Sequence, residues 1–256
     1  MHAADRPARL RRSWDTNAEA WTEAVRERRI PSRRAGTDDA VVAAALRTKP
    51  ARVLDVGCGE GWLARALAEH GCRVVGIDAS ETLVESARAS GGGTFFSMTY
   101  DALGARAAEI GAPFEVAVCN YSLFEAELAP LLDAIRGVLA PDGRLVIQTV
   151  HPWVACGDEP YADGWREETF ATFGRGFTAP MPWFFRTLAS WVDAIAASRF
   201  FETFGMPSAS GRPKLRGWPL SVGKTIAAIC PATLEFFGSV SWTIAVSEPC
   251  LGFPMA

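Results

Sequence analysis

The sequence lacks a long hydrophobic run and has few lysines. The apolar stretch from Val41 to Leu46 stops at Arg47, well short of the roughly 18 residues that a membrane-spanning helix needs. Only three residues are lysine, and the 26 Lys and Arg residues are outnumbered by 29 Asp and Glu, for a formal net charge of -3. A protein that binds many phosphates usually carries a basic surplus. We therefore expect no membrane span, and the charge balance disfavours a nucleic-acid substrate without excluding one.

Clustered cysteines are also absent. The six cysteines are spread over the chain with no C-x-x-C pair and no histidine spaced to join them, so neither a zinc site nor a disulfide framework is expected. The first residues contain arginines but no apolar core of a signal peptide. These features predict a cytoplasmic protein with reduced thiols and no metal.

The composition is that of a globular chain. Of the 256 residues, 49% are hydrophobic and 21% are charged, enough apolar surface to offset the entropy lost on folding. The length fits one domain, or one domain with an appendage. The composition does not distinguish a monomer from a homodimer.

Residues 51–150 alternate between apolar strands and helices. Strands are predicted at 52–56, 74–77, 94–98, 114–119 and 144–150, with helices at 62–70, 81–89 and 128–139 between them. Continuous apolar strands separated by helices indicate a parallel sheet that is covered on both faces. The right-handed crossover rule then favours an α/β doubly wound sheet.

The flanking segments differ from this core. Residues 1–50 are predicted to form a helical cover, with Ser13 capping a first helix and Thr37 capping a second. Residues 151–204 hold 13 of the 27 aromatic residues, mixed with Gly and Pro, and are predicted to be an irregular substrate-pocket segment. Residues 205–256 contain two strand-like runs, 234–237 and 242–246, that would complete the sheet.

A glycine-rich turn follows the first core strand. After Val53–Val56, glycines stand at positions 57, 59 and 61, and a helix follows. Such a turn lets backbone amides approach a ligand closely, because no Cβ intervenes. The spacing differs from the dinucleotide fingerprint G-x-G-x-x-G. Asp55, just before the turn, suits an amine or ammonium group better than a pyrophosphate.

Two further acids follow the next strands. Asp78 ends the second core strand, where a carboxylate can accept both hydroxyls of a ribose. Asp101 follows the third strand, where it can accept the exocyclic amine of adenine. Three acids at three successive strand ends thus match an amine, a ribose and an adenine in order.

These motifs resemble the core of the class I S-adenosylmethionine-dependent methyltransferases. In that family a Leu-Asp-x-Gly-x-Gly-x-Gly motif similar to residues 54–61 opens the site, the acid after the second strand holds the ribose, and an acid-small pair, here Asp101–Ala102, holds the adenine. The resemblance covers roughly 100 residues and implies a Rossmann-like, mostly parallel seven-stranded sheet. It implies that S-adenosylmethionine is bound by Asp55, Gly57, Cys58, Gly59, Asp78, Ala79, Asp101, Ala102 and Asn120.

The N-terminal segment resembles the cover of small-molecule members of this family. In those proteins the segment closes over the methionine end of the cofactor, and we expect Arg33 to approach its carboxylate. The fourth strand ends in Cys119-Asn120-Tyr121-Ser122. This departs from the N/D-P-P-Y/F tetrad of DNA amino-methylases and disfavours that activity.

Methyl transfer requires an acceptor atom aligned with the cofactor sulfur. Alignment alone can lower the barrier by roughly 7–11 kcal/mol, so a catalytic base is optional. If a base is used, His151 is the first candidate and Tyr121 the second. A flat, apolar acceptor is expected to stack on the aromatic segment. The candidate acceptor-binding residues are Trp14, Tyr121, His151, Trp153, Trp183 and Phe184.

The sequence therefore predicts a methyltransferase that acts at oxygen or nitrogen of a small aromatic or heteroaromatic molecule, releasing S-adenosylhomocysteine. Three alternatives remain: a tRNA or rRNA methyltransferase, encouraged only by the arginines of residues 6–34; a protein that binds the cofactor without transferring its methyl group; and a nicotinamide-dependent oxidoreductase.

Overall fold

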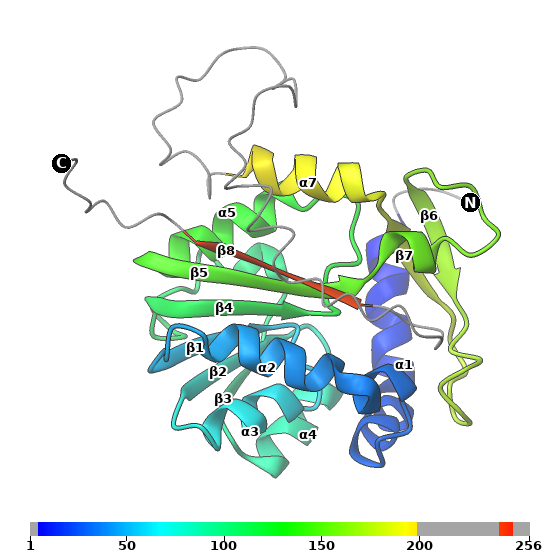
Figure 1. Ribbon diagram of the computed structural model, residues 1–256. Helices are drawn as coiled ribbons and strands as arrows, with labels where there is room; N and C mark the ends of the chain where they lie inside the picture. The colour runs from blue at the N-terminus through cyan, green and yellow to red at the C-terminus, as the bar shows by residue number, and fades with distance from the viewer. Residues whose placement is uncertain (1–4, 199–240, 248–256) are drawn as a thin grey trace.

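A mostly parallel six-stranded sheet organises the molecule (Figure 1). The computed structural model describes residues 5–198 and 241–247. The strand order is β3-β2-β1-β4-β5-β8; the first five strands run parallel and β8 is antiparallel to β5. The strands are β1 (Arg52–Val56), β2 (Arg73–Asp78), β3 (Thr94–Ser97), β4 (Phe114–Asn120), β5 (Leu139–Val150) and β8 (Ser241–Ser247).

Helices connect these strands as the alternation predicts. The core helices are α3 (Trp62–Ala68), α4 (Glu81–Ser90) and α5 (Ala129–Val138), with a short 3₁₀ turn η3 (Tyr100–Ala102) after β3. The α/β class and all five predicted parallel strands are confirmed. The predicted strand at 242–246 corresponds to β8, and the one at 234–237 lies outside the described residues, so a seventh strand stays a prediction.

Both faces of the sheet are buried, which explains the continuous apolar strands. Neighbouring residues of β1 point to opposite faces: Val53 packs with Val41 and Leu63 beside α2 (Asp38–Leu46) and α3, whereas Leu54 packs with Leu132 beside α5. Figure 1 shows α2, α3 and α4 on one side of the sheet, with α5 and α7 (Leu188–Ala197) on the other.

The N-terminal segment is helical, but both predicted caps are wrong. Helix α1 (Arg6–Arg26) begins seven residues before Ser13, whose buried hydroxyl donates to the Ala179 carbonyl at 2.9 Å. Thr37 has helical backbone angles and makes no cap hydrogen bond, because a π-turn, η2 (Arg33–Thr37), runs directly into α2. A side-chain cap requires an extended backbone at the capping residue, and neither position has one.

The aromatic segment is more regular than predicted. It contains a short helix α6 (Pro152–Ala155), an antiparallel pair β6 (Gly164–Glu168) and β7 (Met181–Phe185), and α7. Aromatic side chains of this segment pack on one another; the Phe170 and Phe177 rings, for example, are stacked at 4.9 Å between centroids. Such ring–ring contacts help to hold the segment in place, although its apolar residues follow neither a helical nor a strand period.

Within residues 5–198 and 241–247, no helix combines the length and apolar character that crossing a bilayer requires. The same described residues contain no group of three His, Cys, Asp or Glu side chains suited to hold a metal ion.

Candidate functional site

The glycine turn lies at the carboxyl ends of β1 and β2. The amides of Gly57 and Cys58 both donate to the Ile77 carbonyl, at 2.8 and 3.0 Å, which fastens the turn to β2. Gly57 has a φ of 78°, and a Cβ built there would lie 2.4 Å from the Cβ of Ser122. No other residue fits this position, because both the backbone angle and the space require glycine.

Asp78 is fixed at the end of β2 by backbone amides. Its Oδ2 accepts from the Gly59 amide at 2.9 Å and its Oδ1 accepts from the Ser80 amide at 2.9 Å. Burial raises the pKa of Asp78, and these amide hydrogen bonds oppose the shift. The carboxylate is therefore held against the glycine turn, at the edge where open α/β sheets bind their ligands.

Asp55 is the most perturbed acid of the site. Its side chain is buried, and its Oδ2 has no hydrogen-bond partner among the described residues. Burial, with a smaller contribution from the charge of Asp78, raises the pKa of Asp55 to about 8. A buried carboxyl of this kind is an unusual structural element and a common functional one. A cationic ligand group would lower this pKa and pair with the carboxylate.

The predicted adenine pair is more exposed than these two acids. Asp101 and Ala102 lie in η3, where Asp101 is exposed and its pKa is lowered by a hydrogen bond with the Thr99 side chain. Tyr100, which the sequence analysis did not single out, donates its hydroxyl to the Ser122 carbonyl at 3.0 Å. That hydroxyl lies 2.8 Å from the Cβ position of Gly57, so Tyr100 brings η3 against the glycine turn.

Asn120 and Arg33, the other two predicted cofactor contacts, come from β4 and η2. Asn120 ends β4, and its buried Oδ1 lacks a partner in the described part of the chain. Arg33 donates from Nε to Asp38 at 2.8 Å and its guanidinium lies 4.2 Å from the Trp62 ring centroid, at the start of α3. Arg33 is therefore near the turn, with part of its guanidinium already engaged.

Glu60 ties α1 to the glycine turn, a feature that the sequence analysis missed. Its fully buried carboxylate pairs with Arg26 of α1 at 3.1 Å and with Arg65 of α3 at 2.7 Å. Arg26 also donates to Ser90 of α4 at 2.6 Å. In addition, the Trp21 Nε1 of α1 lies 3.7 Å from the Cβ position of Gly59. Helix α1 thus lies directly beside the turn. The contacts that hold it there join residues far apart in the sequence, so no local sequence pattern predicts them.

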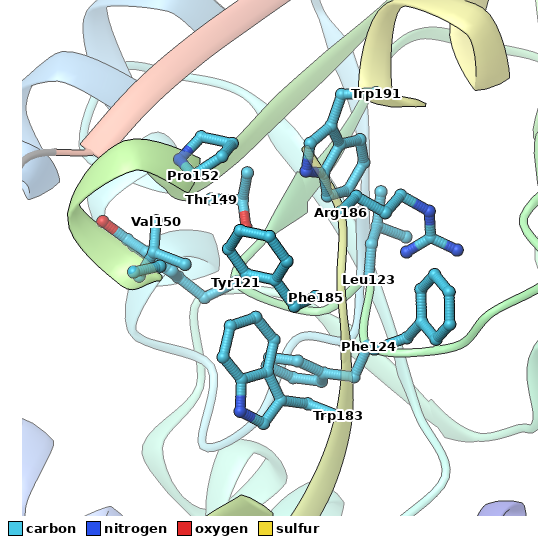
Figure 2. A pocket seen from close by; sticks show the side chains of 12 residues that line it. Tyr121, Leu123, Phe124, Thr149, Val150, Pro152, Trp183, Phe185, Arg186 and Trp191 are labelled. Carbon is cyan, nitrogen blue, oxygen red and sulfur yellow. The ribbon is translucent and has the colours of Figure 1, made fainter. Parts of the chain in front are cut away.

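A pocket opens between β4, β5 and the aromatic segment (Figure 2). In Figure 2 the Tyr121 ring lies between Thr149 and Trp183, with Arg186 and Trp191 on one side and Val150 and Pro152 on the other. Tyr121 has a φ of 51°, a left-handed conformation that is rare for a bulky side chain and typical of functional positions. The remaining lining residues are Leu123, Phe124, Ala155, Phe184 and Phe185.

The pocket is narrow. Its volume is about 40 Å³, whereas a single water needs roughly 10–15 Å³. This pocket volume is much smaller than the engineered cavity of about 150 Å³ that binds benzene.

The structure brings together only part of the predicted acceptor set. Tyr121, Trp183 and Phe184 line the pocket, whereas Trp14 packs against Phe124 from α1. Trp153 is 70% exposed and contacts Tyr161. His151 stands between two lining residues, and its Nδ1 accepts from the Trp153 amide at 3.3 Å as the cap of α6.

An open α/β sheet with acids at its ligand-binding edge defines a domain of the type that binds nucleoside-containing cofactors. The profile of a family described as "Methyltransferase domain" matches residues 53–143. This part of the chain is therefore similar to a methyltransferase domain.

Two O-methyltransferases match part of the chain. The chain is 38% identical to a ubiquinone biosynthesis O-methyltransferase of Xylella fastidiosa over 108 residues, which covers 41% of this chain and 44% of that one. It is 36% identical to the Roseobacter denitrificans protein of the same name over 126 residues, 48% and 50% of the two chains. The chain thus spans half or less of the length of these relatives.

One solved structure resembles most of the chain. A putative O-methyltransferase from Nostoc punctiforme superposes with a TM-score of 0.50 at 16% identity, covering 83% of this chain and 56% of that one. At this identity the likeness concerns the fold alone, and it supports the Rossmann-like methyltransferase architecture.

Proposed function

We propose that the protein is a cytoplasmic S-adenosylmethionine-dependent methyltransferase that methylates oxygen or nitrogen of a small aromatic or heteroaromatic molecule. The observation that carries this proposal is the pair of buried acids beside the glycine turn. Asp78 is hydrogen-bonded to the Gly59 amide, and the Oδ2 of Asp55 has no partner, in a region similar to a methyltransferase domain. A ligand with an ammonium group and a ribose satisfies both acids.

The residues of the turn suggest how the cofactor is held. Asp55 faces the α-amino group, Asp78 accepts the ribose hydroxyls, and the backbone from Gly57 to Gly59, with Ala79, approaches the nucleoside. Asp101 and Ala102 hold the adenine, and Asn120 supplies its unpartnered Oδ1. When bound, S-adenosylmethionine supplies an electrophilic methyl group on a positively charged sulfur.

The N-terminal residues 1–50 act as a cover in this proposal. The Glu60 ion pairs hold α1 beside the turn, which excludes water from the methionine end of the site. Arg33 binds the cofactor carboxylate with the guanidinium nitrogens that Asp38 leaves available. Residues 51–150 bind the cofactor, 151–204 form the acceptor pocket and 205–256 complete the sheet.

The acceptor lies in the pocket beside Tyr121. Its aromatic walls favour a flat ring, and the names of the matched relatives favour oxygen as the methylated atom. A wall side chain must move to admit the ring. Tyr121 and His151 stand at the carboxyl ends of β4 and β5, where either side chain can accept the acceptor's proton.

The direct test is incubation with methyl-labelled S-adenosylmethionine and a cell extract, followed by mass spectrometry of labelled products. We expect one or a few labelled small molecules. Label in RNA, with a steep loss of activity at moderate salt, would instead indicate a nucleic-acid methyltransferase. Calorimetric binding of the cofactor without any labelled product would indicate a binding protein.

A further inference from the structure

We infer that Gln148, a buried residue of β5, is a positioning residue for the cofactor. It holds the π-turn η2 at the amino-acid end of S-adenosylmethionine, and so helps the site to distinguish S-adenosyl amino acids from nucleosides that lack this end. The inference rests on the proposed function and deepens it, because it names a determinant of cofactor recognition outside the glycine turn.

Gln148 lies on the face of the sheet that α2 covers. On β1, β4 and β5, the valines two residues before Asp55, Asn120 and Gln148 all belong to the apolar cluster that includes α2. Side chains of a strand alternate between its two faces, so these three polar side chains share one face. Asn120 and Gln148 are also direct neighbours in the register of β4 and β5. Gln148 therefore lies on the same face as the acid that we propose for the amino group of the cofactor.

The Gln148 side chain is bonded to the end of η2. Its Nε2 donates to the Thr37 carbonyl at 3.0 Å, in a buried contact between residues 111 positions apart. From the first residue of η2, the Arg33 guanidinium lies 4.2 Å from the ring centroid of Trp62, which begins α3 directly after the glycine turn. Since β4 lies between β1 and β5, η2 extends from the side of the glycine turn to β5, across the carboxyl ends of the strands.

The shape of η2 depends on such an anchor. A π-turn is rare and is found frequently at functional sites. Gly36 within η2 has a φ of 123°, which departs from the helical path, and a Cβ built there would meet nothing within 4 Å. Packing at Gly36 therefore does not fix the kink. Without the Gln148 amide, η2 can shift relative to the strand ends, and Arg33 shifts with it.

The amino-acid end of the cofactor carries an ammonium group and a carboxylate. In the proposed binding mode Asp55 receives the ammonium group, and Arg33, which belongs to η2, binds the carboxylate. Gln148 acts on this end of the cofactor through η2. Its side chain should therefore matter for ligands that have an amino-acid end and hardly for those that lack one.

The test compares S-adenosylhomocysteine with 5′-methylthioadenosine, which has the same adenosine and a thioether but no amino-acid end. Both are titrated calorimetrically into the wild-type protein and into Gln148→Met, which is similar in size but has no donor. We expect Gln148→Met to weaken binding of S-adenosylhomocysteine about 10-fold or more and to leave binding of 5′-methylthioadenosine within about threefold.

Cys72→Ala is the control for this comparison. Cys72 directly precedes β2, at the opposite edge of the sheet, and its buried Sγ donates to the Pro50 carbonyl at 3.2 Å. The variant thus loses another buried contact between a side chain and a carbonyl, and it should change neither affinity.

A second variant shows whether Gln148 acts through η2. Arg33→Met should weaken binding of S-adenosylhomocysteine to a similar extent. Adding Gln148→Met should then weaken it by less than about threefold more, because two residues that act through one element are not additive. Gln148→Asn keeps the amide but is one methylene shorter. It should lose affinity in the same selective way, and it decides the question if Gln148→Met does not fold.

An equal loss of affinity for both nucleosides, or no loss for either, would overturn the inference. Fully additive effects of Gln148→Met and Arg33→Met would overturn it as well. Failure of the proposed function looks different, because the wild-type protein would then bind neither S-adenosylhomocysteine nor 5′-methylthioadenosine.

Discussion

Protonation of Asp55 should control cofactor affinity. Burial raises the pKa of this carboxyl to about 8 in the ligand-free protein, whereas an ammonium group pairs only with the ionised form. With a pKa near 8, about 1% of the protein has an ionised Asp55 at pH 6 and about half at pH 8. The association constant for S-adenosylhomocysteine should therefore rise roughly 50-fold from pH 6 to pH 8. The raised pKa of Asp78 acts in the same direction.

Calorimetry measures this effect in two ways. Affinity is determined at pH 6, 7 and 8, and the enthalpy at pH 7 is compared in buffers of different ionisation enthalpy, which should show release of about one proton on binding. Asp55→Asn should bind more weakly but with no rise between pH 6 and 8. Asp101→Asn is the matched control, because Asp101 is exposed and its pKa is lowered. A wild-type affinity that changes less than about twofold, with no proton release, would refute the reasoning.

Three further perturbations have outcomes set by the structure. Gly57→Ala should lower the free energy of unfolding, measured by urea denaturation, by about 2–4 kcal/mol, because φ is positive there and the new Cβ would clash with Ser122. The control is Gly137→Ala in α5, which has open space around it and should not destabilise the protein. Glu60→Gln should cost about 1–3 kcal/mol in the same assay because it weakens ion pairs to a buried carboxylate. Glu81→Gln, in an exposed pair, should leave the stability nearly unchanged. His151→Ala should slow labelled methyl transfer without changing affinity for S-adenosylhomocysteine; unchanged turnover would exclude His151 as the base.

The core could be predicted from the sequence because its signals are local. Each parallel strand is a short apolar run, and the glycine turn with Asp55 and Asp78 occupies consecutive strand ends, so topology alone brings these residues to one edge. The match of residues 53–143 to a methyltransferase domain follows the same signals.

The rest depends on contacts between residues far apart in the chain. Ser13 has the chemistry of a cap, but its hydroxyl bonds to Ala179, 166 residues away, so local preference is overridden. The ion pair of Glu60 with Arg26 and the hydrogen bond from Gln148 to Thr37 likewise have no local sequence signature. The aromatic segment has no single period, because some of its rings, such as those of Phe170 and Phe177, pack on one another.

A crystal structure of the protein soaked with S-adenosylhomocysteine tests the central claim most directly. We expect the ribose hydroxyls within hydrogen-bond distance of the Asp78 carboxylate and the amino group near Asp55. Density for the nucleoside at any other place, or none at saturating concentration, would contradict the account.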